Sequence, residues 1–304
     1  RSSTAIGGDM FCLYKPHDGD LIAFNGSGKA PAAATAQWYA EQGITKIERV
    51  SPHSVTVPGV IDGWSQLMAA YGTKSLGDVL QPAIRFAHDG FPVHHRVHAD
   101  WSDWAEDLAN DPTAAKYLLI DGRAPEIGEV IRQPLLGKTL EHIAETGRAG
   151  FYEGWVAEDI VSFLQGKGGL HTMEDFANVK GDFVTPIKAD YKGYEVWECP
   201  PNGQGIVALE MLNILGGMDL AKLDPLSTER LHLEIEAARL AYTDRDAVLA
   251  DPSQSDVPIE KWLSEEHAAH QRALIDRSKR MGDLPPSELS DHKDTVYLTV
   301  VDKD

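Results

Sequence analysis

The chain has 304 residues, 42% of them hydrophobic, which is enough to bury one large core or two modest ones. Its 28 basic and 47 acidic residues give a formal net charge of −19, which repels nucleic-acid phosphates and anionic lipid headgroups. Nucleic acid is therefore not an expected partner, and no segment approaches the 18 apolar residues of a membrane-spanning helix.

The first predicted element is a β-hairpin over residues 10–25, where two apolar runs flank a Pro-His-Asp-Gly turn. Residues 31–42 are rich in helix formers, and the Gly43 that follows is a suitable helix end. Two more helices are predicted over 60–71 and 77–88. The first third of the chain is therefore expected to be mainly helical.

The remaining elements are also mostly helices. Two short strands are predicted within 186–198, around Lys192-Gly193, and a strand is predicted over 295–301. The polar, turn-prone segment 282–294 is expected to be an exposed or mobile loop. Helices are predicted at 137–146, 155–165, 227–249 and 264–279. This mixture predicts an α+β fold.

Several familiar kinds of site are not supported by the sequence. The segment Gly26–Lys29 lacks the upstream glycine of a phosphate loop and is followed by Ala30 where that loop has Ser or Thr. No GxSxG nucleophile motif occurs, and two cysteines, expected to be small core residues, do not make a disulfide framework. The clustered histidines lack zinc-site spacing and are expected at the surface: His94, His95, His98, His267 and His270. We therefore expect no metal or cofactor.

A threonine stands at the first position of the last predicted strand. If the Asp294–Thr295 peptide bond is cut, Thr295 gains a free α-amine with a reference pKa of about 8, which can act as base for its own hydroxyl. One residue would then supply both the nucleophile and the base. The residues alone leave a second interpretation open, in which Thr295 is only a β-forming residue.

Long motifs follow one another along the chain. They include IGGDMF, SVTVPGVIDGW and YGTKSLGDVLQPAIRFAHDGFPV in the first third, then GFYEGWVAEDI, LEIEAARLAYTDRDAVLADP and finally DTVYLTVVDKD. The segment GGLHTMEDFANVKGDFVTPIKADYKGYEVWECPP adds a further long match. Together these motifs resemble the γ-glutamyltranspeptidase family over essentially the entire chain.

This resemblance implies the four-layer αββα sandwich of N-terminal-nucleophile hydrolases. It implies that residues 1–294 form the large subunit, and that residues 295–304 begin the small, catalytic subunit. Autocatalytic cleavage between Asp294 and Thr295 would release the two subunits. Thr295 would then attack a γ-glutamyl or similar small amide and form an acyl-enzyme, from which water or an acceptor amine takes the acyl group.

One departure from the family pattern concerns substrate recognition. The family has an arginine three residues before the Ala-Pro that is here Ala30-Pro31, and Ser27 occupies that position. Serine cannot bind a carboxylate as a charged, bidentate partner, and Lys29 is either a point charge for the substrate or a solvated loop residue. The GSGKAP sequence is more similar to the cephalosporin-acylase-like and oxamate-amidohydrolase-like members of the family.

Three functional alternatives follow from the sequence. The enzyme could be a true γ-glutamyltransferase, or an acylase or oxamate amidohydrolase acting on another small acyl amide. A third alternative is an unprocessed, noncatalytic relative. The resemblance implies that the family's oxyanion donors lie beyond Asp304. The sequence leaves the cellular location open, whether cytoplasmic, periplasmic or secreted.

Overall fold

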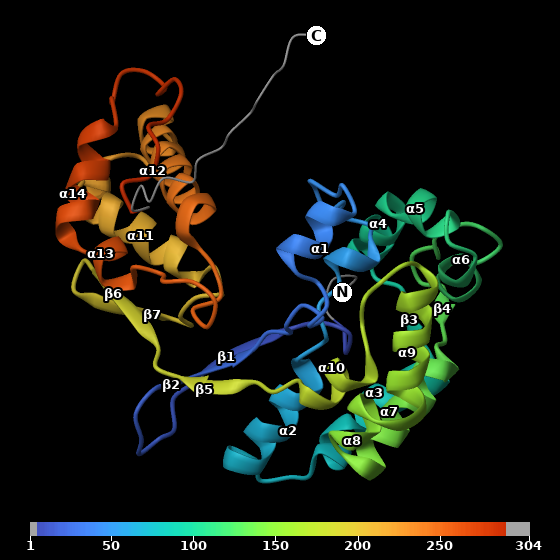
Figure 1. Cartoon of the computed structure of the whole chain (residues 1–304). Helices are drawn as coiled ribbons and strands as arrows, with labels where there is room; N and C mark the ends of the chain where they lie inside the picture. Colours follow the sequence, from blue (N-terminus) through green and yellow to red (C-terminus); the bar gives the residue numbers. More distant parts are fainter. Residues whose placement is uncertain (1–4, 290–304) are drawn as a thin grey trace. The chain divides into compact units, whose positions relative to one another are not determined.

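A computed structural model describes residues 5–289 of the chain (Figure 1). These residues form two compact units. Unit 1 contains residues up to 10 and residues 26–182, and unit 2 contains residues 11–25 and the residues from 183 onward. The predicted strand over 295–301 lies outside the described residues.

Unit 1 consists mainly of short helices. A two-stranded antiparallel ribbon of β3 (Phe91–Pro92) and β4 (Val130–Ile131) accompanies them. The helices are α1 (Ala36–Glu41), the 3-10 turn η1 (Pro52–Ser54), α2 (Val60–Tyr71), α3 (Leu76–Asp89), α4 (His95–Asp103), α5 (Ala105–Ala109), α6 (Pro112–Leu118), α7 (Pro134–Thr146), α8 (Ala149–Tyr152), α9 (Gly154–Gly166) and α10 (Met173–Asn178).

Local sequence signals explain where the central helix of this unit begins and ends. The Ser75 hydroxyl accepts a hydrogen bond from the Asp78 backbone, and the Asp78 carboxylate accepts one from the Ser75 backbone. This reciprocal capping box starts α3. Gly90 ends the helix at φ +93°, a conformation that side-chain-bearing residues adopt only with strain.

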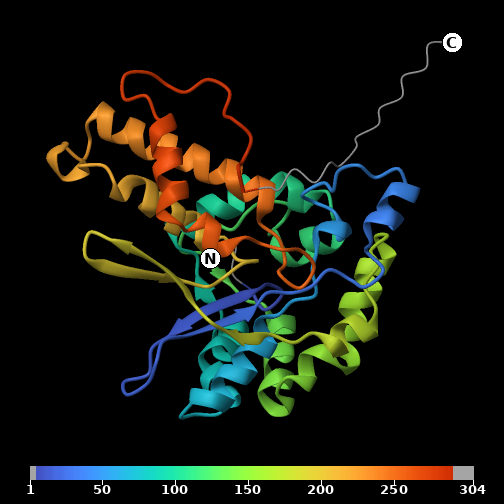
Figure 2. The same ribbon diagram turned by 60° about the vertical axis from the view of Figure 1, so that its left-hand side comes forward.

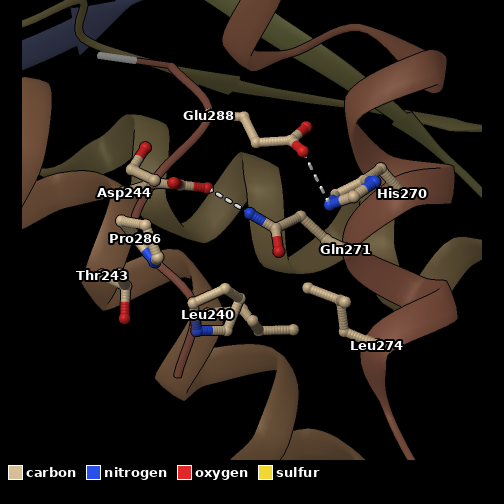
Figure 3. Close-up of a pocket in the computed structure, with 10 residues that line it drawn as sticks. Leu240, Thr243, Asp244, His270, Gln271, Leu274, Pro286 and Glu288 are labelled. Carbon is tan, nitrogen blue, oxygen red and sulfur yellow. Dashed lines mark hydrogen bonds and ion pairs between the residues drawn. The ribbon is translucent and has the colours of Figure 1, made fainter. Parts of the chain in front are cut away.

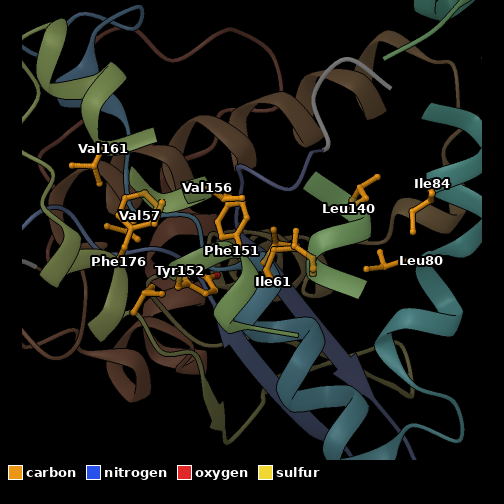
Figure 4. Packing of buried hydrophobic residues seen from close by; sticks show 14 residues of the cluster. Val57, Ile61, Leu80, Ile84, Leu140, Phe151, Tyr152, Val156, Val161 and Phe176 are labelled. Atoms are coloured by element: carbon orange, nitrogen blue, oxygen red, sulfur yellow. The ribbon is translucent and has the colours of Figure 1, made fainter. Parts of the chain in front are cut away.

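The core of unit 1 is one apolar cluster. α3 packs along α7, and α7 packs against α8, so that side chains from α2, α3, α7 and α8 meet in the interior (Figure 4). Ile61, Ile143 and Tyr152 are fully buried there, and each such side chain stabilises the fold by about 1.5–3 kcal/mol relative to an exposed one.

An ion pair and further hydrogen bonds of a buried aspartate connect this core to the segment around Gly181. Asp62 on α2 is buried and accepts a hydrogen bond from Nε of Arg148 at 2.7 Å. Its second oxygen accepts bonds from the Gly181 backbone and the Gln66 side chain, both at 2.7 Å. The Tyr152 hydroxyl donates to the Pro58 carbonyl oxygen at 2.7 Å, and burial raises the pKa of this phenol. The start of α2 is therefore fixed by charge as well as by packing.

Most of the strands and the longest helix, α12, belong to unit 2. Its three-stranded sheet has the order β1-β2-β5, and a separate antiparallel hairpin joins β6 to β7. The elements are β1 (Met10–Tyr14), β2 (Ile22–Gly26), β5 (Asp182–Val184), β6 (Ile187–Tyr191), β7 (Tyr194–Glu198), α11 (Gly205–Gly216), the 3-10 turn η2 (Leu220–Lys222), α12 (Thr228–Val248), α13 (Ile259–Trp262) and α14 (Glu265–Leu274).

Helix α11 is the centre of unit 2. It packs against α12, α14 and the β6–β7 hairpin, which is drawn in yellow in Figure 2. Two apolar clusters surround it, one containing Ile214 and Leu233, the other containing Ile206 and Trp262. The helix is enclosed by these neighbours, and this explains why its sequence is apolar on nearly every side.

Most of the predicted elements are confirmed, with differences at their ends. The hairpin over 186–198 turns at Lys192 and Gly193, whose φ angles of 51° and 87° suit a tight two-residue turn. Helix α1 starts only at Ala36, because the Thr35 side chain caps it. Helix α14 ends at Leu274, earlier than expected, and α11 was not expected. Within the described residues, no helix is long and apolar enough to span a membrane.

The segment before the predicted cleavage point is exposed over most of its described residues, 282–289, as expected. Two residues differ, because Ser287 is 6% exposed and Leu289 is 3% exposed. Leu289 packs with Ile206 and Trp262, and this apolar contact explains why a polar sequence is held against the helices.

Candidate functional site

The predicted nucleophile is not among the described residues. Both Thr295 and Asp294 lie outside them, so their roles stay predictions. The structure does describe the two predicted substrate-binding positions, Ser27 and Lys29, in the loop directly after β2.

The backbone of this loop is held against the segment that starts α2. The Gly28 backbone donates to Asp9 Oδ1 at 2.9 Å, and the Val57 backbone donates to the Lys29 carbonyl oxygen at 2.9 Å. A β-carbon on Gly28 would lie 1.7 Å from the Val57 carbonyl oxygen, and one on Gly59 would lie 2.0 Å from that of Gly26. Both glycines are therefore required for this close contact between two chain segments.

The side chains of the loop offer no guanidinium. Lys29 is exposed, and no ion pair joins it to a carboxylate among residues 5–289. Ser27, at the position where the resemblance implies an arginine, is half-buried. The loop can therefore supply a hydroxyl and a point positive charge, but no planar, bidentate carboxylate partner.

A second group of interactions holds the chain just before the predicted cleavage point. The Leu289 backbone donates to the Ser287 hydroxyl at 3.1 Å, and Lys261 Nζ donates to the Glu288 carbonyl oxygen at 2.5 Å. His270 Nε2 lies 3.3 Å from Glu288 Oε1. Ser287 and Glu288 line one side of a cavity of about 520 Å³, and residues of α12 and α14, His270 among them, line the other side (Figure 3).

A buried polar cluster lies beside this cavity, and sequence reasoning missed it. Glu210 and Asp244 are fully buried, and His267, which was expected at the surface, is only 5% exposed. Nε2 of His267 lies 2.8 Å from Asp244 Oδ2 and 3.4 Å from Glu210 Oε1. The expectation of a surface position is confirmed for His94, His95 and His270, which are exposed.

Burial and contact shift the protonation of this cluster. Burial raises the pKa of Glu210 to about 7. Burial alone lowers the pKa of His267, but its contacts with the Asp244 and Glu210 carboxylates outweigh burial and raise that pKa to about 9. At neutral pH, and without any bound ion, the cluster therefore contains a protonated histidine between two acidic side chains.

Comparison with known proteins identifies the family. The γ-glutamyltranspeptidase family model matches residues 1–304. The chain belongs to the γ-glutamyltranspeptidase family. A glutathione hydrolase-like YwrD proenzyme from Bacillus subtilis is 36% identical over 302 residues, which is 99% of this chain and 57% of the relative. The chain thus spans little more than half the length of this relative.

Two solved structures agree with this assignment. The γ-glutamyltranspeptidase of Helicobacter pylori matches with a TM-score of 0.87 at 27% identity, over 96% of this chain and 86% of that one. A cephalosporin acylase from Bacillus halodurans matches with a TM-score of 0.82 at 36% identity, over 89% of this chain and 51% of that one. The α+β class and the fold of this N-terminal-nucleophile hydrolase family are therefore confirmed for the chain.

Family membership gives a physical meaning to the motifs found in the sequence. Gly59 of the VPG motif and Gly28 of the GSGKAP loop are the two residues whose missing side chains let their segments touch. Pro58 of the same motif accepts the Tyr152 hydrogen bond. The motifs therefore describe one joint, in which the 26–31 loop is fixed to the start of α2.

Proposed function

We propose that the chain is part of a self-processing amide hydrolase or acyltransferase with Thr295 as its nucleophile. Residues 1–294 are then the large subunit, and the small subunit begins at Thr295 and is the partner of the large one after cleavage. The family match over the whole chain supports this proposal, and DTVYLTVVDKD resembles the family's processing junction.

The maturation step transfers one acyl group within the chain. The Thr295 hydroxyl attacks the Asp294 carbonyl carbon, and the acyl group moves from the Thr295 nitrogen to its oxygen. Water then hydrolyses the ester, which leaves a carboxylate on Asp294 and a free amine on Thr295. That amine takes the proton from the Thr295 hydroxyl when the residue attacks its substrate.

Substrate turnover repeats the same chemistry on a small amide. Thr295 Oγ forms an ester with the acyl group, and the amine of the substrate leaves with a proton. Water or an acceptor amine then attacks the ester and restores the hydroxyl. We propose that these steps proceed without a metal or cofactor.

Our proposal on substrate specificity rests on the loop after β2. Its backbone is fixed, and Ser27 stands where an arginine would bind the α-carboxylate of a γ-glutamyl group. Without that bidentate partner, a small acyl amide other than a γ-glutamyl amide is the favoured substrate class. A γ-glutamyl substrate held by the Lys29 charge alone is the second candidate function.

Parallel assays of the full-length protein test this specificity. Its kcat/KM would be measured on a γ-glutamyl anilide, on a glutaryl amide and on oxamate. Preference for the glutaryl amide, which keeps the carboxylate of the γ-glutamyl group but lacks its α-amine, or for oxamate, whose carboxylate is bonded directly to the amide carbonyl, supports the proposal. A clear preference for the γ-glutamyl anilide shows that the missing arginine does not decide the substrate. Lack of activity on all three, with an uncut Asp294–Thr295 bond, supports the noncatalytic alternative.

A further inference from the structure

We infer that Glu210, Asp244 and His267 form a binding site for a divalent transition-metal cation of the zinc class, which links α11, α12 and α14. The three residues come from three different helices of unit 2, and all of them are buried. One ligand atom of each lies within 4.8 Å of those of the other two. A single cation can therefore contact all three side chains.

In each of the two carboxylates, one oxygen accepts a hydrogen bond from a neighbouring side chain and the other oxygen accepts none within residues 5–289. Trp262 Nε1 donates to Glu210 Oε2 at 2.5 Å, and Gln271 Nε2 donates to Asp244 Oδ2 at 2.5 Å. The other oxygens, Glu210 Oε1 and Asp244 Oδ1, are buried and accept no hydrogen bond from the described residues. A buried oxygen without a partner is costly, and outer donors that orient a carboxylate are typical of metal sites.

The spacing of the donors fits a small cation. Zinc binds histidine nitrogen and carboxylate oxygen at about 2.0–2.2 Å, so neighbouring ligands in a tetrahedral site are about 3.3 Å apart. His267 Nε2 and Glu210 Oε1 are 3.4 Å apart, whereas His267 Nε2 and Asp244 Oδ2 are at a hydrogen-bond distance of 2.8 Å, which a bound ion would have to widen. The imidazole favours a zinc-class ion over Mg²⁺ or Ca²⁺, which prefer shells made only of oxygen.

Charge and access agree with this assignment. Two carboxylates and a neutral imidazole carry a charge of −2, which one divalent cation balances in the interior. Asp244 and Gln271 also line the cavity of about 520 Å³, which gives a route for the ion and room for a water as a further ligand (Figure 3).

Metal titration of the full-length protein tests this inference. The protein is first stripped with a chelator and dialysed, and is then titrated with Zn²⁺ alone by calorimetry and with Co²⁺ by visible absorption. We expect one high-affinity zinc per chain, and intense Co²⁺ bands typical of a four-coordinate site. Glu210→Gln, which keeps an acceptor for Trp262, should weaken zinc binding at least tenfold and remove the Co²⁺ bands.

The matched control distinguishes this site from adventitious binding at the surface. His94 and His95 form an exposed pair on unit 1, and the His94→Ala/His95→Ala variant should bind zinc as the wild type does. Zinc binding that is lost in this control and kept in Glu210→Gln overturns the inference. A wild-type protein that binds no zinc also overturns the inference, because hydrogen bonds and ion pairs alone then hold the cluster together.

Discussion

Gly28 and Val57 are so close that a β-carbon on Gly28 would lie 1.7 Å from the Val57 carbonyl oxygen. The carbonyl oxygen of Lys29, the residue after Gly28, accepts a hydrogen bond from the Val57 backbone N–H. This hydrogen bond can form only if Gly28 and Val57 are in close contact. This joint fixes the 26–31 loop, to which the proposed function assigns recognition of the substrate's acyl group. The effect of this contact on stability and on substrate turnover can be measured.

Gly28→Ala should separate the two segments. The added methyl group cannot fit against a backbone atom, so we expect a loss of about 1–3 kcal/mol in the free energy of unfolding and a lower kcat/KM. Urea denaturation and the amide assays measure the two effects. Gly166→Ala is the control, because nothing lies within 4 Å of its β-carbon, and it should change stability by less than about 1 kcal/mol. Equal effects of the two substitutions would contradict the close contact.

Asp62→Asn should be among the most destabilising isosteric changes in unit 1. It removes the charge that Arg148 contacts at 2.7 Å, and breaking a buried pair costs about 3–5 kcal/mol. Because the Arg148 side chain is 30% exposed, we expect the lower end of that range. Tyr152→Phe removes two neutral hydrogen bonds, one donated to the Pro58 carbonyl oxygen and one accepted from the Asp62 backbone, and should cost about 2 kcal/mol. A larger loss for Tyr152→Phe in chemical denaturation would reverse this ranking.

Ser27→Arg should shift specificity toward γ-glutamyl substrates. A guanidinium at this position can form two charge-assisted hydrogen bonds with an α-carboxylate, worth about 1.5–3 kcal/mol, or roughly a 10- to 100-fold lower KM for a γ-glutamyl anilide. The KM for oxamate should not fall in the same way. Ser27→Ala is the control, and it should leave the preference between the two substrates nearly unchanged. An unchanged preference in Ser27→Arg would show that this position does not contact the acyl group.

His171 should make unit 1 less stable in mild acid. The residue is 1% exposed, its Nε2 lies 2.9 Å from the Val55 carbonyl oxygen, and burial lowers its pKa below the ordinary 6.5. The unfolded chain then binds a proton more readily than the folded one, so stability is full above pH 6.5 and falls as pH drops below it. His171→Gln should flatten this part of the curve in denaturation at pH 7.5 and 5.5. Identical slopes would mean that other groups cause the acid sensitivity.

Local signals predicted the elements whose sequence pattern has one dominant period or turn. Lys192-Gly193 marks the β6–β7 turn because both residues adopt positive φ, and α12 was found from its helical pattern within one residue at each end. Helix α11 was missed because GIVALEMLNILG is apolar on almost every face. A helix enclosed on all sides loses the periodicity by which a surface helix is recognised.

The candidate sites depend on contacts between distant residues, which spacing along the chain does not show. Glu210, Asp244 and His267 are 23 or more residues apart and converge only when α11, α12 and α14 pack together. The same holds for Gly28 and Val57. Motif resemblance did identify the segments that form the loop joint, but not the reason for their glycines.

The central claim is that a freed amino group on Thr295 makes its hydroxyl reactive. Intact-mass measurement and N-terminal sequencing of the purified full-length protein test this most directly. We predict two fragments, the smaller beginning with Thr295, and a single uncut chain for Thr295→Ala without amidase activity. A fully active protein whose backbone is unbroken between Asp294 and Thr295 would contradict the account.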